Sequence, residues 1–174
     1  DADVVDLILG KQRATRVGRG VADVRYRCFS PELQRAVSNY IASGGALFTS
    51  GAYVATDLCG SEGVTAADVE FAKRVLRVEL VENMATRTFT ATTRSRSAAR
   101  LATSRDYTIC DEYRPDMYAV NSVDGLAAVG SATELMHYTD SRLAAAVGYR
   151  DECGARVVMG FPFEAITDAG GRDV

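Results

Sequence analysis

The first fifty residues contain a strand, a helix and a second strand in an order that limits the possible folds. "DVVDLIL" (3–9) is almost continuously apolar and β-branched, which is typical of a strand covered on both faces. "FSPELQRAVSNYIASGG" (29–45) predicts a helix with Ser30 as N-cap, Pro31 at the first helical position and two glycines at its end. The polar, Arg-rich residues 11–27, which include two glycines, predict a long exposed loop, and "ALFTS" (46–50) predicts a short buried strand. Such a strand–helix–strand unit implies a parallel sheet with a right-handed crossover.

The second half of the chain has a different pattern, dominated by short strands. Residues 65–80 begin as a helix capped by Thr65, with Asp68 as the partner in a capping box. Four further expectations are an exposed or edge strand in 86–96, two short strands around a turn in 117–130, a hairpin in 141–161, and a truncated helix in 161–168. We therefore expect an α/β fold, parallel in its first half and antiparallel in its second, in a single domain spanning 1–174.

Composition and charge exclude several classes of partner. The chain has 174 residues, 47% of them hydrophobic, and a net charge of −3, so nothing favours nucleic acid or an acidic membrane as a partner. No run approaches the ~18 apolar residues of a membrane span. The cysteines have no metal-type spacing, so we expect no metal and no other cofactor. The sequence is compatible with either two disulfides or four free thiols at Cys28, Cys59, Cys110 and Cys153. Because the chain starts at Asp1, we expect it to be part of a larger multidomain protein.

The turn after residue 50 decides whether the chain is read as an enzyme. Open α/β sheets bind ligands where a strand ends and the chain enters a helix, so we expect ligand-binding residues at Ser50, Gly51, Ala52, Tyr53 and Asp57. The G-x-S-x-G pattern of a nucleophile elbow is not met, and Ser50 precedes the turn. Tyr53 is a poor nucleophile because the pKa of tyrosine is about 10. For Asp57 we prefer a capping or turn-stabilising role over a catalytic one.

A serine nucleophile needs a base, and the chain has one histidine, His137. We prefer a structural or surface role for His137, which lies in a strand-like segment. Glu62, Asp68 and Glu70 are interpreted as solvated charges on a helix face. A carboxylate pair for glycoside hydrolysis cannot be assigned from sequence, because the separation of the two groups in space defines it.

Two segments resemble a known superfamily. "YIASGGALFTSGAYVATDL" (40–58) and "VVMGFPFEAI" (157–166) are similar to class I glutamine amidotransferase-like proteins. Three segments, 4–12 ("VVDLILGKQ"), 29–58 and 160–166 ("GFPFEAI"), most resemble the C-terminal region of secreted Bacteroidetes proteins labelled xanthan lyase, whereas residues 62–114 match poorly. The resemblance implies a flavodoxin-like three-layer α/β sandwich in a secreted, periplasmic or cell-surface protein that handles polysaccharide.

The chain departs from this superfamily at the catalytic positions. Active amidotransferases carry a cysteine at the turn and a late F-H-P-E-type segment, whereas this chain has Ser50–Tyr53 without cysteine and "FPFE" (161–164) without histidine. Only Glu164 can match, which argues against glutamine hydrolysis. The xanthan lyase label indicates a carbohydrate context rather than a reaction, because known xanthan lyases resemble a helical toroid with β-sandwiches.

Three functions remain open from the sequence. The first, which we favour, is a non-catalytic domain that binds carbohydrate or contacts other domains of its parent chain. The second is a carbohydrate-active hydrolase or lyase, with catalytic candidates Ser50, Tyr53, Asp57, His137 and Glu164. The third is an oligomer-assembly domain, like the degenerate amidotransferase-like domains of some glycosidases, which predicts a large apolar surface patch.

Overall fold

The strand–helix–strand unit predicted at the start of the chain is present in the computed structural model of the protein. The structure describes residues 3–11, 13–15, 18–21, 24–60, 63–94, 105–152 and 154–168. Strand β1 (Val4–Ile8) pairs in parallel with β4 (Ala46–Ser50), and helix α1 (Pro31–Ala42) connects them. The Ser30 side chain accepts a hydrogen bond from the Leu33 N–H at 3.3 Å, so the predicted N-cap is confirmed.

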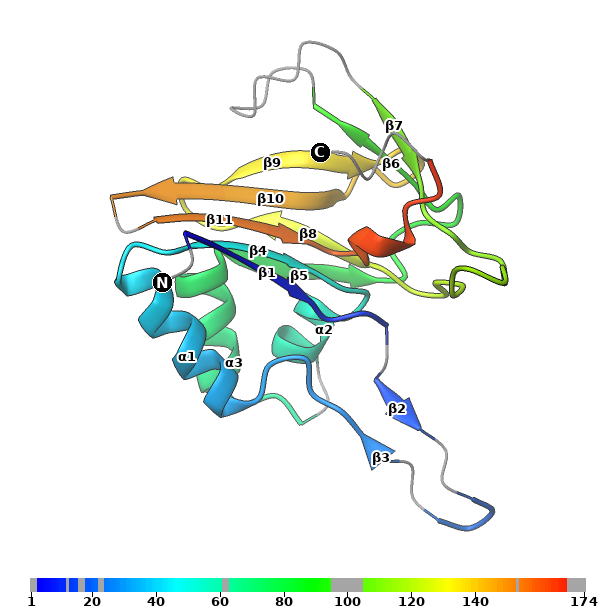
Figure 1. Cartoon of the computed structure of the whole chain (residues 1–174), viewed down its shortest axis with the longest axis horizontal. Coiled ribbons are helices and arrows are strands. Elements are labelled where there is room, and N and C mark those ends of the chain that lie inside the picture. Colours follow the sequence, from blue (N-terminus) through cyan, green and yellow to red (C-terminus); the bar gives the residue numbers. More distant parts are fainter. Residues whose placement is uncertain are drawn as a thin grey trace.

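A nine-stranded mixed sheet forms the centre of the molecule (Figure 1). Its main strand order is β1-β4-β11-β10-β9-β6-β7, and β5 and β8 branch from β10. The later strands are β5 (Val78–Asn83), β6 (Thr90–Thr93), β7 (Asp106–Thr108), β8 (Asp124–Ala128), β9 (Thr133–Tyr138), β10 (Ala144–Asp151) and β11 (Gly154–Met159). β11 is parallel to β4 and antiparallel to β10, so a parallel first half continues into an antiparallel second half, as predicted.

Helices α1, α2 (Val54–Cys59) and α3 (Ala66–Phe71) lie on one side of the sheet (Figure 1). α3 continues into a π-helical turn, Ala72–Leu76. Alternate residues of the central strands point to opposite faces, and Leu47 and Val158 pack beneath these helices. The predicted capping box is confirmed, because Thr65 and Asp68 bond reciprocally at the start of α3.

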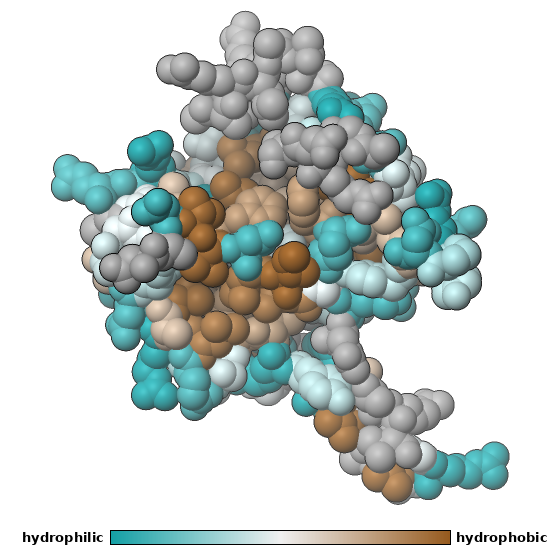
Figure 2. Space-filling model, viewed as in Figure 1, coloured by the Kyte–Doolittle hydropathy of each residue, from teal (hydrophilic) through white to brown (hydrophobic). Residues whose placement is uncertain are grey.

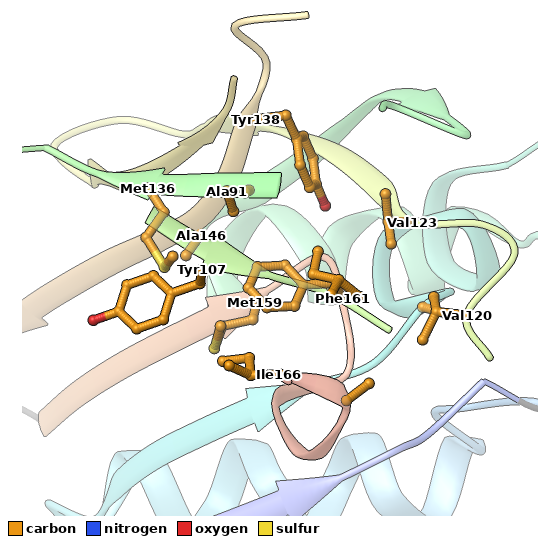
Figure 3. Close-up of a cluster of buried hydrophobic side chains, with 14 of the residues drawn as sticks. Ala91, Tyr107, Val120, Val123, Met136, Tyr138, Ala146, Met159, Phe161 and Ile166 are labelled. Atoms are coloured by element: carbon orange, nitrogen blue, oxygen red, sulfur yellow. The ribbon is translucent and has the colours of Figure 1, made fainter. Parts of the chain in front are cut away.

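The opposite face has its own apolar core, shown in Figure 3, to which Tyr138, Met159 and Phe161 belong. Strands β6 and β7 curl over this core, and the chain after β11 closes it through a bridge between Ile109 and Ile166. Strands and connecting segments therefore cover the face where a three-layer sandwich would carry helices. The broad α/β class is confirmed, and the flavodoxin-like arrangement is not.

Several local expectations were wrong because they depended on distant partners. β1 was expected to be covered on both faces, yet it is an edge strand with Val4 62% and Ile8 53% exposed. In 86–96 the strand is β6, which lies between β9 and β7 instead of at an edge. Only one of two strands expected in 117–130 is present, namely β8. The helix expected in 161–168 is one 3₁₀ turn, Phe163–Ala165.

Residues 11–27, expected to form a long exposed loop, contain two very short strands. β2 (Ala14–Thr15) and β3 (Val24–Arg25) pair antiparallel and form an arm that projects from the body (Figure 1). The hairpin expected in 141–161 is confirmed as β10 and β11. No helix in the described part of the chain is long and apolar enough to cross a membrane.

Candidate functional site

The turn that follows β4 lies beside the end of β1, at the carboxyl ends of two parallel strands. The Ala52 N–H donates to the Gly10 carbonyl oxygen at 2.8 Å, and the Leu9 N–H donates to the Ser50 carbonyl oxygen at 2.9 Å. A Cβ atom on Gly51 would lie 3.0 Å from the Leu9 Cβ and 3.2 Å from the Gly10 oxygen. The segment after β1 (residues 9–10) and the turn after β4 (residues 51–52) are thus packed backbone against backbone. Together they form the floor of the candidate site.

An open cavity of about 870 Å³ lies over this floor. Two aromatic rings, two cationic side chains and an amide contribute to its lining. The lining residues are Ile8, Leu9, Gly10, Lys11, Arg13, Ala14, Tyr53, Tyr118 and Asn121. The Arg13 guanidinium carbon lies 5.6 Å from the centroid of the Tyr53 ring. A cavity at this edge of an α/β sheet agrees with the usual place for a ligand.

Lys11 and Glu164 both contact Tyr118. The Lys11 ammonium lies 5.4 Å from the centroid of the Tyr118 ring and donates a hydrogen bond to the Ala119 carbonyl oxygen. The Tyr118 hydroxyl donates to Glu164 Oε1 at 2.5 Å. Gly10 has a positive φ of 60°, and a Cβ there would lie 3.9 Å from the Tyr118 hydroxyl oxygen. The Tyr118–Glu164 pair therefore lies directly over the end of β1.

The Tyr118–Glu164 pair is built to donate and accept hydrogen bonds rather than to supply a phenolate. Burial, together with the hydrogen bond to Glu164 and the charge of that residue, raises the pKa of Tyr118 far above its ordinary value. Tyr118 therefore stays protonated at any ordinary pH. Glu164 Oε2 is buried and has no hydrogen-bond partner among the described residues.

A second, smaller hollow of about 340 Å³ adjoins the first at the base of the β2–β3 arm. It is lined by Arg13, Ala14, Arg25, Tyr26, Arg27, Asp57 and Gly63. Asp57 Oδ2 accepts a hydrogen bond from the Cys28 N–H at 2.7 Å and lies 4.0 Å from Arg27 Nε. Asp57 thus fixes the chain that leads from the arm into α1, a remote segment, whereas the sequence favoured a cap or a stabilising contact within its own turn.

The structure does not bring the remaining catalytic candidates together. Ser50 is fully buried, and its hydroxyl has no hydrogen-bond partner in the described part of the chain. His137 lies on β9, separated from β4 by β11 and β10, which corresponds to about 14 Å at the usual strand spacing. His137 Nε2 contacts Arg142 Nη1 at 3.0 Å, and burial with the charges of Arg94 and Arg142 lowers the pKa of this histidine. A Ser50–His137 pair is therefore not formed.

Among the five ligand-binding residues expected from the sequence, only Tyr53 lines the large cavity and only Asp57 lines the small one. Gly51 and Ala52 are buried and contribute the turn itself. Glu164 lies behind Tyr118 as its hydrogen-bond acceptor.

Sequence reasoning missed Lys11, Arg13, Tyr118 and Asn121. The first two follow β1 in a segment interpreted as a loop, and no motif marks the other two. The cationic residues directly after the first strand were the one available signal, because that is the ligand-binding edge of a parallel sheet.

Three of the four cysteines lie in the described part of the chain. Burial and the neighbouring Asp57 and Asp124 raise the pKa of the Cys28 thiol to about 12, so it is not a thiolate nucleophile. Cys28, Cys59 and Cys110 are free thiols, and Cys153 lies outside the described residues. No group of three or more His, Cys, Asp or Glu side chains within the described ranges could hold a metal ion.

Neither a family model nor a curated protein sequence matches the chain. Solved structures do match it, among them three β-galactosidases. Gan42B of family GH42 from G. stearothermophilus matches with a TM-score of 0.51 and 13% identity over 98% of this chain and 20% of its own. The enzyme from Bacillus circulans sp. alkalophilus matches with a TM-score of 0.51 and 12% identity, covering 97% of this chain and 21% of the enzyme. The enzyme from Rahnella sp. R3 matches with a TM-score of 0.52 and 14% identity, covering 90% of this chain and 19% of the enzyme.

At this identity, the likeness shows a shared fold. The chain spans about a fifth of the length of these galactosidases, so its fold corresponds to a part of each of them.

Proposed function

We propose that this chain is a saccharide-binding domain of a carbohydrate-active protein. The observation that carries the proposal is the cavity at the carboxyl ends of β1 and β4, with Tyr53 and Tyr118 in its lining. Aromatic rings offer apolar faces to sugar rings, while Asn121 and the Tyr118 hydroxyl can hydrogen-bond to sugar hydroxyls. The fold shared with a part of several β-galactosidases supports a carbohydrate context.

Calorimetric titration with galactobiose, galactotriose and lactose tests this proposal. Tyr53→Ala removes one ring from the cavity, and we expect binding to weaken at least tenfold, about 1.4 kcal/mol. Tyr113→Ala is the matched control, because Tyr113 is 84% exposed and lines neither hollow. Equal affinity of the wild type and Tyr53→Ala would place any saccharide elsewhere, and no binding by the folded wild type would refute the proposal for these sugars.

A second candidate is a hydrolase or lyase, for which the Tyr118–Glu164 pair is the favouring observation. A protonated hydroxyl and a carboxylate with a buried, unbonded oxygen meet at the edge of the cavity. Glycoside hydrolysis ordinarily needs two carboxyl groups, and the other candidate, Asp57, is held by the Cys28 N–H. Release of nitrophenol from nitrophenyl β-galactoside, abolished by Glu164→Gln, would favour this candidate over simple binding.

The sequence resemblance to amidotransferase-like proteins also stays a proposal. The parallel β1–β4–β11 group, with α1 between the first two strands and a tight turn after β4, is compatible with a modified flavodoxin-like fold.

The assembly alternative draws support from the exposed apolar side chains of β1, and Figure 2 shows an apolar area on the face of the molecule where β1 lies in Figure 1. Sedimentation velocity would test it, since a monomer at high concentration contradicts it.

A further inference from the structure

The two hollows form one continuous surface, because Arg13 and Ala14 line both. The surface runs from the end of β1, past the Tyr53 ring, to the base of the β2–β3 arm. A ligand longer than one sugar ring could therefore contact both hollows at once.

Positive charge gathers on this surface although the whole chain is acidic, with 20 Lys and Arg against 23 Asp and Glu. Four cationic side chains line the two hollows, namely Lys11, Arg13, Arg25 and Arg27. Asp57 is the one carboxylate among the described lining residues, and it already accepts the Cys28 N–H. Among the described lining residues, cationic side chains therefore outnumber carboxylates, the reverse of the whole chain.

The cations differ in what neutralises them. Arg27 forms an ion pair with the buried Asp68, with 2.7 Å between Arg27 Nη2 and Asp68 Oδ1, so its charge is neutralised within the fold. Arg13 has the Tyr53 ring as its neighbour and makes no ion pair with a carboxylate in the described part of the chain. Lys11 donates to the neutral Ala119 carbonyl and likewise pairs with no carboxylate among the described residues. These two charges flank the aromatic rings of the large cavity.

From this arrangement we infer that the saccharide bound here is an acidic one, carrying uronic acid carboxylates. The inference rests on the saccharide binding proposed above and names its class. A guanidinium presents paired donors that match a carboxylate, so Arg13 would hold a uronate group while the sugar ring lies against Tyr53. Lys11 would contact a second carboxylate, or the same one from the side of Tyr118.

The test compares each acidic sugar with its uncharged form. Trigalacturonate and trimannuronate, and the fully methyl-esterified form of each, are titrated into the protein by calorimetry in 50 mM and 500 mM NaCl. We expect at least one acid to bind tenfold or more tightly than its ester, with an affinity that falls at the higher salt concentration. Arg13→Gln should weaken binding of that acid at least tenfold and leave binding of the ester unchanged.

Arg35→Gln is the matched control, because Arg35 lies on the exposed side of α1 and, among the described residues, pairs with Glu32 alone, at 3.7 Å. Binding of the acids in this variant should equal that of the wild type. Equal affinity for acid and ester, or an acid affinity that survives Arg13→Gln, would overturn the inference and leave saccharide binding intact. Failure of acids, esters and galactotriose alike to bind the folded protein would overturn both.

Discussion

Replacing Asp124 with Asn is expected to remove a pH dependence of stability that this one carboxyl group creates. Asp124 is fully buried at the start of β8 and supports the helix that follows the candidate site. Its Oδ2 accepts the N–H groups of Ala55 and Thr56 at 2.6 and 2.9 Å, and its Oδ1 accepts the Thr56 hydroxyl at 2.5 Å. Asparagine has nearly the same shape, and its amide oxygen can keep accepting backbone N–H groups.

The magnitude follows from the pKa of Asp124. Burial raises that pKa to about 7, and the hydrogen bonds from Thr56 and Ala55 offset only part of the effect. Since the folded state holds its proton more tightly than the unfolded state, the folded state is favoured at low pH. Stability is therefore lost as the pH rises from about 4 to about 7. At about 1.4 kcal/mol per pKa unit, the loss between pH 5 and pH 8 is about 2 to 3 kcal/mol.

Urea unfolding followed by far-ultraviolet circular dichroism at pH 5, 6.5 and 8 measures this effect, because the chain has no Trp to serve as a fluorescence probe. The stability difference, Asp124→Asn minus wild type, should increase with pH by about 2 to 3 kcal/mol, while other titrating groups cancel.

Asp140→Asn is the matched control in this experiment. Asp140 also accepts three hydrogen bonds, but at the surface, where those from Arg87, Thr86 and Ser141 outweigh desolvation and lower its pKa. The stabilisation that Asp140 contributes is fully present above the pKa of this residue in the unfolded chain, and it is lost only on acidification below that pKa. The difference in free energy of unfolding between Asp140→Asn and the wild type should therefore not rise between pH 5 and pH 8. An Asp124→Asn variant with the same pH slope as the wild type would refute the reasoning.

Three further changes test the fold around the site. Arg27→Ala removes the cationic partner of Asp68, whose pKa is lowered to about 2, and should lower the free energy of unfolding in urea at pH 7 by about 1 to 3 kcal/mol. An unchanged unfolding midpoint would show that the hydrogen bonds from Gln34 and Thr65 are enough to stabilise the Asp68 carboxylate. Thr65→Ala removes the capping box of α3 and should cost about 1 kcal/mol, seen as a lower thermal midpoint. Gly160→Ala places a Cβ 2.1 Å from the Asp124 carbonyl oxygen, so a loss of about 3 kcal/mol or more is expected. A Cβ on Gly18 meets no atom of the described residues within 4 Å, so Gly18→Ala should melt like the wild type.

Features encoded by neighbouring residues were predicted correctly from the sequence. The Ser30 cap, the Thr65–Asp68 capping box, the parallel β1–β4 pair and the β10–β11 hairpin depend on spacing over a few residues or on a standard crossover. A cavity lies at the strand-to-turn edge where ligand-binding residues were expected, because every parallel strand delivers its next loop to the same edge, and ligand binding there stays a prediction.

Features that depend on distant residues were not predictable in this way. Asp68 was interpreted as a solvated charge, yet it is 2% exposed, because Gln34 and Arg27 approach it from a remote part of the chain. Tyr118 carries no local motif, and its place in the cavity depends on its contact with Glu164, 46 residues away. Hydrophobic periodicity and helix-capping rules describe one helix or strand at a time, so they cannot predict which loops contact each other in the folded protein.

Strand β1 has a consequence for how this chain behaves on its own. It is the terminal strand of the sheet along its main path, and its outer edge offers backbone groups to any extended peptide. Two apolar side chains, Val4 and Ile8, stand on the same face with Asp6 between them, since alternate residues share a face. The single carboxylate of Asp6 places a negative charge in any strand stacked directly on that face. In a second copy stacked on this face, Asp6 would therefore oppose the association that Val4 and Ile8 favour, through a repulsion that salt would weaken.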